Sequence, residues 1–187
     1  RPSSWSAAID NITYGDDGGD GRLMILAAGN IWDNLGHADY INRNDISPVE
    51  NPAQAWNAIT VGAYTEKINI THEDYMDWTP LAVAQDLSPR SRTSVGVRQW
   101  PIKPEIVMEG GNLAVPPNGS HADVVDDLAL LTTFNRPQER LFTIAGDTSA
   151  ATALTARLAA QIIDQRPTIW PETTRGLLIH SAEWTSA

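Results

Sequence analysis

The chain has 187 residues, of which 42% are hydrophobic and 19% are charged, and its formal net charge is −10. This composition fits one globular domain or a large part of one, and an acidic chain repels phosphate groups, so neither nucleic acid nor an anionic membrane is an expected partner. The absence of cysteine excludes disulfides and cysteine-based metal sites, and no apolar run approaches the roughly 18 residues that cross a bilayer.

The first half of the chain predicts one helix and two buried strands. Residues 3–14 begin with serines that can cap a helix and continue with apolar residues at helical spacing. Residues 23–28 are a continuous apolar run and residues 58–63 a largely apolar one, and both predict buried strands. Residues 31–56 are polar and predict a long loop, and residues 64–101 are interrupted by prolines and predict irregular structure.

The second half predicts two short strands and two helices. Residues 105–108 and 141–144 predict the strands, and residues 113–138 predict a loop with at most one further short strand. Residues 149–165 contain neither Gly nor Pro, and large apolar residues recur there every four positions, as in a helix. A final helix is predicted to begin at Pro171. Helices that alternate with buried strands indicate an α/β fold with a mostly parallel sheet.

Five short blocks, spread over nearly the whole chain, point to one protein family. They are the run LMILAAGN that ends at Asn30, the proline loop and strand from Asn51 to Ala63, the segment KPEIVMEGG that starts at Lys103, the run DTSAAT from Asp147 to Thr152, and the segment from Trp170 to Ala182. Each block alone is a weak signal. In this order the five resemble the subtilisin-like serine proteases, the subtilases of peptidase family S8. The stretch from Ser88 to Arg92 fits either the serine-rich stretch of that family or a plain surface loop.

The resemblance implies a three-layer subtilisin-like α/β fold with a mostly parallel sheet, in which residues 1–187 are the C-terminal part of a single catalytic domain and the N-terminal portion is missing. It implies a bacterial serine endopeptidase that hydrolyses peptide bonds through an acyl-enzyme on Ser149, with Asn30 in the oxyanion hole. The substrate would be a protein or peptide. No metal or other cofactor is expected, apart from a structural calcium that the complete domain could hold. The resemblance favours an extracellular location and leaves a cytoplasmic one open.

The two residues suit these roles chemically. A serine hydroxyl is a poor nucleophile until a base accepts its proton. Ser149 lies at the start of a predicted helix, where backbone N–H groups and the positive end of the helix dipole favour a developing negative charge. The side-chain amide of Asn30, at the end of a predicted strand, can supply a second donor to that charge.

Two departures from the family affect this interpretation. The catalytic Asp and His of the family precede the oxyanion asparagine, but only 29 residues precede Asn30 here, and none of them is histidine. The four histidines are His37, His72, His121 and His180. We therefore expect an absent upstream segment to supply both residues, and the fragment alone to be inactive. The family also has Gly where this chain has Asp147. A carboxylate there would repel the oxyanion that forms when Ser149 attacks a substrate carbonyl, so Asp147 is expected to reduce or redirect activity.

A second interpretation keeps the fold but not the activity. The chain would then be a catalytically degenerate subtilase fold that serves as a binding or scaffold module, which Asp147 and the missing triad partners would explain. A nucleotide-binding domain and an α/β-hydrolase are disfavoured, because the chain has no phosphate-binding glycine motif and no G-x-S-x-G. The acidic clusters at 16–20 and 72–74 are expected to be solvated surface rather than metal sites.

Overall fold

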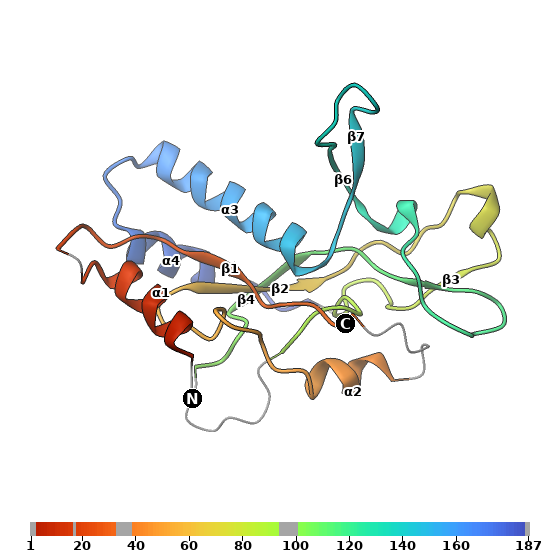
Figure 1. Ribbon diagram of the computed structural model, residues 1–187, viewed down its shortest axis with the longest axis horizontal. Coiled ribbons are helices and arrows are strands. Elements are labelled where there is room, and N and C mark those ends of the chain that lie inside the picture. The colour runs from red at the N-terminus through yellow and green to blue at the C-terminus, as the bar shows by residue number, and fades with distance from the viewer. Residues whose placement is uncertain (1–2, 17, 33–38, 94–100, 186–187) are drawn as a thin grey trace.

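In the computed structural model, which describes residues 3–16, 18–32, 39–93 and 101–185, three short parallel strands form the centre of the fold (Figure 1). They lie in the order β1-β2-β4 and comprise Ile25–Ala27, Ile59–Tyr64 and Ile106–Glu109. Each strand lies within or next to one of the apolar runs that predicted it. β1 is shorter than its run, because only three of its residues pair with β2.

Helices cover both faces of this sheet, as Figure 1 shows. They are α1 (Ser4–Tyr14), α3 (Asp147–Gln165) and α4 (Pro171–His180). Successive side chains of a strand point to opposite faces. Ile25 accordingly packs against the cluster that contains Ala151 of α3, whereas Leu26 packs against the cluster that contains Ile9 of α1. The predicted three-layer α/β fold with a parallel sheet is confirmed. None of the helices in the described ranges is long and apolar enough to cross a membrane.

A buried charge network holds the start of β4. The side chain of Lys103 is completely buried, and its ammonium group donates to the carbonyl oxygen of Ala58 at 2.9 Å. The Oε1 atom of Glu105 accepts from both Lys103 and Arg175, the latter at 3.0 Å. The Oε2 atom of Glu105 accepts the N–H of Thr60 at 2.8 Å. Because a buried charge is costly unless it is paired, this network fixes β4 beside β2.

The regions predicted as loops contain short elements that the sequence did not reveal. The 31–56 region holds α2 (Tyr40–Asp45), the 64–101 region holds the 3-10 helix η1 (Glu73–Tyr75) and β3 (Thr79–Pro80), and the 113–138 region holds β5 (Ala114–Val115), the 3-10 helix η2 (Asp126–Leu128) and β6 (Leu130–Thr133). β3 pairs antiparallel with β5, which is remote in the sequence. No local pattern marks strands of two residues, because their pairing depends on the rest of the fold.

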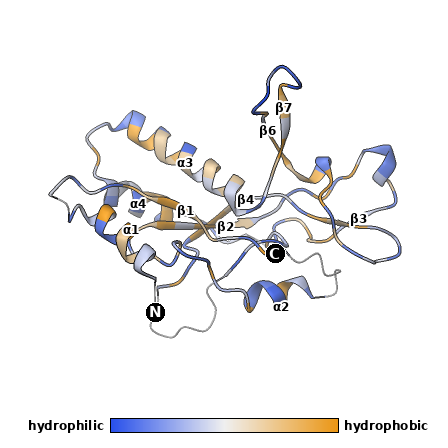
Figure 2. Cartoon of the chain, viewed as in Figure 1, coloured by the Kyte–Doolittle hydropathy of each residue, from blue (hydrophilic) through white to orange (hydrophobic). Residues whose placement is uncertain are grey.

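β6 and β7 (Phe142–Ala145) form an antiparallel hairpin that projects from the body of the fold (Figure 1). The strand expected at 141–144 is therefore present, but it pairs outside the parallel sheet. Leu131, Leu141 and Phe142 are exposed on this hairpin. Hydrophobic residues concentrate in the central strands, whereas the hairpin tip and α2 are largely hydrophilic (Figure 2).

Candidate active site

Asn30 follows the carboxyl end of β1. The chain leaves the strand through Ala28, whose N–H donates to the carbonyl oxygen of Val61 at 2.9 Å. It then turns at Gly29, whose φ of 95° would strain a residue with a side chain. Asn30 forms an isolated antiparallel bridge with Ser91. The turn and the bridge together fix the backbone of Asn30 at the edge of the sheet where β1 ends.

Thr148 orients the side-chain amide of Asn30. The Oδ1 atom of Asn30 accepts the N–H of Thr148 at 3.1 Å and its hydroxyl at 2.8 Å. A backbone N–H can only donate, so the oxygen of the amide, not its nitrogen, must face Thr148. The Nδ2 atom of Asn30 therefore points away from Thr148, and it has no acceptor within the described part of the chain. An oriented and uncommitted donor of this kind is what an oxyanion hole requires.

Ser149 is the third residue of α3, and it is exposed. The first N–H groups of a helix have no carbonyl partner one turn earlier, so the N–H of Ser149 is available at the positive end of the helix dipole. The hydroxyl of Ser149 has no hydrogen-bond partner among the residues that the structure describes. Since Thr148 is bonded to Asn30 and precedes Ser149 directly, the nucleophile candidate and the two candidate oxyanion donors lie together.

Gly110 lets the start of α3 approach the end of β4. A Cβ at Gly110 would lie 2.4 Å from the Cβ of Ala63 and 2.9 Å from the carbonyl oxygen of Asp147. The carbonyl oxygen of Gly110 accepts the N–H of Asp147 at 2.6 Å. A glycine at this position thus brings the helix that carries Ser149 to the edge of the sheet at which Asn30 lies.

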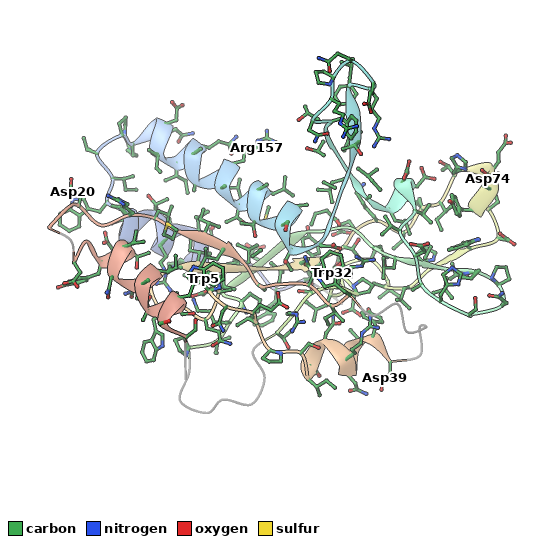
Figure 3. The ribbon with its side chains drawn as sticks, in the orientation of Figure 1. Trp5, Asp20, Trp32, Asp39, Asp74 and Arg157 are labelled. Carbon is green, nitrogen blue, oxygen red and sulfur yellow. The ribbon has the colours of Figure 1, made fainter. Side chains whose placement is uncertain are left out.

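Asp147 has an unfavourable backbone conformation, and Arg90 partly compensates its negative charge. Its φ of 64° lies in the left-handed region that glycine prefers and that Asp tolerates better than most residues. Its carboxylate lies 3.6 Å from the guanidinium of Arg90, which in turn stacks over the ring of Trp32 at 5.0 Å (Trp32 is labelled in Figure 3). Burial raises the pKa of the Asp147 carboxyl above its usual value, and Arg90 opposes part of that rise.

The stretch from Ser88 to Arg92 is a buried turn beside Asn30, so the surface-loop interpretation is wrong. Ser88 and Ser91 are 2% and 0% exposed, respectively. The N–H of Ser91 donates to the carbonyl oxygen of Ser88 at 2.9 Å, and the Oγ of Ser91 accepts the N–H of Ala63 at 2.9 Å. These contacts join the turn to β2 and set the places from which its two arginines extend.

Arg92 binds Asn30 and Glu50 at once. Its Nε donates to the carbonyl oxygen of Asn30 at 3.0 Å, its Nη2 lies 3.0 Å from Oε1 of Glu50, and its Nη1 donates to the carbonyl oxygen of Pro48 at 3.2 Å. Sequence reasoning missed both this ion pair and the one at Asp147. The only signal in the sequence was the pair of arginines in Ser-Pro-Arg-Ser-Arg, which does not indicate the acidic partners.

A cavity of about 170 Å³ lies beside the start of α3, at the base of the hairpin formed by β6 and β7. Its lining includes Arg90, Gly110, Leu128, Ile144 and Asp147. The ion pair of Arg90 and Asp147 therefore forms one wall of a hollow that is otherwise largely apolar.

The described histidines do not meet the candidate nucleophile. His72 and His121 lie at the two ends of a series of contacting aromatic rings, and His180 is the last residue of α4. None of these three hydrogen-bonds to Ser149. His37 lies outside the described residues. None of the three described histidines is therefore placed to act as a base for the candidate nucleophile.

The acidic clusters lie at the surface where they are described. Asp16, Asp20, Glu73 and Asp74 are exposed, and Asp17 lies outside the described residues. Across residues 3–16, 18–32, 39–93 and 101–185, no group of three or more His, Cys, Asp or Glu could hold a metal ion.

Comparison with known proteins assigns the family. The sequence model that represents the subtilase family, Peptidase_S8, matches residues 1–186. The chain belongs to the subtilase family. At the level of the family it is therefore a serine protease domain, a hydrolase whose substrates are proteins or peptides. No curated protein matches this subtilase significantly.

Proposed function

We propose that this subtilase is a serine endopeptidase in which Ser149 is the nucleophile, and Asn30 and the N–H of Ser149 form the oxyanion hole. Residues 1–187 would be the C-terminal part of a single catalytic domain. The Asp and His of the triad would come from a segment of the full-length protein that precedes Arg1, in keeping with the order of the family.

The orientation of the Asn30 amide carries this proposal. Thr148 accounts for the oxygen of the amide through two hydrogen bonds of 3.1 and 2.8 Å. The nitrogen is left to donate elsewhere, next to the residue that would attack. A simple N-cap role for the Thr-Ser pair would not require an oriented amide from a strand 118 residues away in the sequence.

The reaction would proceed through an acyl-enzyme. As Oγ of Ser149 attacks the carbonyl carbon, the base takes its proton, and the carbonyl oxygen becomes an oxyanion that receives the two N–H donors. The tetrahedral intermediate then expels the amine, which takes the proton from the base. Water then attacks the ester carbon while the base takes its proton. The second tetrahedral intermediate expels Oγ of Ser149, which recovers a proton from the base, and the carboxylic acid product leaves.

A second candidate function is a degenerate subtilase fold that binds or scaffolds without cleavage. Asp147 favours it, because a carboxylate stands two residues before Ser149 with a φ of 64°. The contact of 3.6 Å with Arg90 weighs against it, since a paired carboxylate repels an oxyanion less than an isolated one.

Labelling of the full-length protein with a fluorophosphonate tests the first candidate. The reagent reacts with activated serines, so we expect stoichiometric labelling of Ser149, cleavage of denatured protein substrates, and loss of both in Ser149→Ala. Ser181→Ala, which removes a hydroxyl at the end of α4, is the matched control and should change neither. A folded full-length protein that neither labels nor cleaves would leave the binding or scaffold function in its place.

A further inference from the structure

A single carboxylate lies against the chain next to the oxyanion donor. A Cβ at Gly29 would lie 2.5 Å from Oε2 and 2.8 Å from Cδ of Glu50, so the carboxylate packs directly on the α-carbon of Gly29. Gly29 immediately precedes Asn30. One guanidinium also links the two sites, because Arg92 contacts both the carbonyl oxygen of Asn30 and Oε1 of Glu50 at 3.0 Å.

The backbone holds Glu50 in this place without any ligand. Its N–H donates to the carbonyl oxygen of Ala28 at 2.9 Å, and its carbonyl oxygen accepts the N–H of Ala53 at 2.8 Å. Arg92 is itself fixed by Asn30 and Pro48. The carboxylate is therefore preorganised, which lowers the entropic cost of binding a partner.

One oxygen of Glu50 remains uncommitted. Oε1 contacts Arg92, but Oε2 has no partner in the described part of the chain, and the side chain is 49% exposed. The other carboxylate near Ser149 differs, because the Asp147 side chain is only 22% exposed and its arginine 11%. Of the two carboxylates that pair with Arg90 and Arg92, that of Glu50 is therefore the more accessible to a substrate.

A carboxylate already paired with an arginine can still accept a second cation. This molecule contains such a case, since Glu105 accepts both Lys103 and Arg175. At the half-exposed Glu50, Arg92 is engaged with two carbonyl oxygens as well as with the carboxylate. The positive charge of Arg92 is therefore shared among three acceptors. The carboxylate of Glu50 is not fully neutralised, and its Oε2 atom can attract a further cation.

Given the proposed function, a substrate carbonyl oxygen lies between Ser149 N–H and Asn30 Nδ2. Three bonds separate that oxygen from the Cβ of its own residue. The side chain of that residue therefore lies close to the residues around Asn30, which include Gly29 and the carboxylate of Glu50 that packs on it. We propose that Glu50 is a specificity-determining residue that selects a cationic side chain, Lys or Arg, on the residue whose carbonyl is attacked. Arg92 acts as a positioning residue that holds the carboxylate of Glu50.

A pair of peptide substrates tests this inference on the full-length protein. The two fluorogenic peptides differ only at the residue whose carbonyl is attacked, which is Lys in one and the uncharged norleucine in the other. We expect the wild type to favour Lys by about tenfold or more in kcat/KM, the size that a close charge pair can supply. Glu50→Gln should reduce this ratio to about two or less, mainly through a lower kcat/KM for the Lys peptide. Higher salt should also lower the ratio.

Two further variants and one label keep the outcomes distinct. Glu50→Lys should shift the preference towards a Glu-containing peptide, and Glu172→Gln, which removes the same charge from the exposed start of α4, should leave the ratio unchanged. If the wild type labels at Ser149 and cleaves both peptides, but Glu50→Gln keeps the wild-type ratio, the inference is wrong and the proposed function stands. If Ser149 neither labels nor supports cleavage, both are wrong.

Discussion

The two halves of the candidate site contrast in how firmly they are held. The side chain of Asn30 is bound by Thr148, and its backbone is bound by Ser91 and Arg92. The hydroxyl of Ser149 has no partner in the described part of the chain. Under the proposed function, this chain would supply the donors that stabilise the oxyanion, whereas the base for proton transfer would come from residues outside those that the structure describes. The comparison indicates that electrostatic preorganisation and acid-base chemistry can be tested separately in this protein.

The largest effect is expected from removing the side-chain amide of Asn30, the candidate oxyanion donor that Thr148 holds in place. In full-length protein, Asn30→Ala should lower kcat by about 10²–10³ with little change in KM, because the amide acts only on the oxyanion. That magnitude is the one observed for the corresponding donor of a subtilisin, another member of this family. Steady-state kinetics on a neutral peptide measure it.

Asn30→Asp separates the donor from the packing. Aspartate has the shape of asparagine and can still accept from Thr148, but it cannot donate to an oxyanion. It should lose at least as much activity as the alanine variant. An Asn30→Asp protein with near wild-type kcat would show that the amide plays no part in the reaction.

A smaller effect is expected from loosening the hold on Asn30. Thr148→Val removes the hydroxyl that donates at 2.8 Å but keeps the backbone N–H bond. One such hydrogen bond contributes about 0.5–1.5 kcal/mol, so kcat should fall by roughly three- to tenfold. Thr155→Val is the matched control, because Thr155 is also buried in α3 and its hydroxyl bonds only to Ala151. Equal losses in both variants would mean that Thr148 acts through helix stability alone.

Asp147 gives the smallest effect, of opposite sign. Asp147→Gly should increase turnover a few-fold, because it removes a negative charge near the oxyanion. It should also raise the melting temperature by about 2–4 °C, because the left-handed backbone conformation costs about 1 kcal/mol with Asp and little with Gly. Unchanged turnover in the full-length protein would show that the carboxylate does not disturb the oxyanion. Arg90 would then have neutralised it fully.

The pH dependence separates charge from backbone strain at this position. Burial raises the pKa of Asp147 in the folded protein above its unfolded value, so the folded state holds the proton more tightly and ionisation costs stability as the pH rises. Asp147→Asn removes the charge and keeps the side chain. Its gain in melting temperature should be present at pH 7 and vanish below the usual carboxyl pKa. The matched variant for loss of a negative charge is Asp164→Asn, on the exposed end of α3.

The sequence predicts the fold well where burial is continuous. The runs before Asn30 and up to Ala63 become parallel strands because helices cover both faces of the sheet, and the stretch without Gly or Pro becomes α3, which buries one face. α2 and the two-residue strand β3 were missed, since they are stabilised by contacts from distant segments. The hairpin strand β7 was expected and one short strand was allowed within 113–138, but the antiparallel pairing of β6 with β7 was not predicted, because a local pattern of apolar residues does not identify a partner.

The candidate site was predictable only in part, for a related reason. Asn30 and Ser149 each lie in a block with its own sequence pattern, and the order of the blocks brings them together. Glu50 and Arg92 lie in segments without such a pattern, and they meet because a buried turn places one beside the other. Neither the residue types nor their spacing encodes that meeting, so only the three-dimensional structure reveals it.

The buried turn from Ser88 to Arg92 has a consequence for variation in length. Its two arginines pair with different carboxylates, Arg90 with Asp147 and Arg92 with Glu50, from positions two residues apart. An insertion or deletion of a single residue here would move one guanidinium away from its carboxylate while the other stayed in place. Changes in length are usually tolerated in loops, but homologues that retain both acidic residues should keep this turn at constant length.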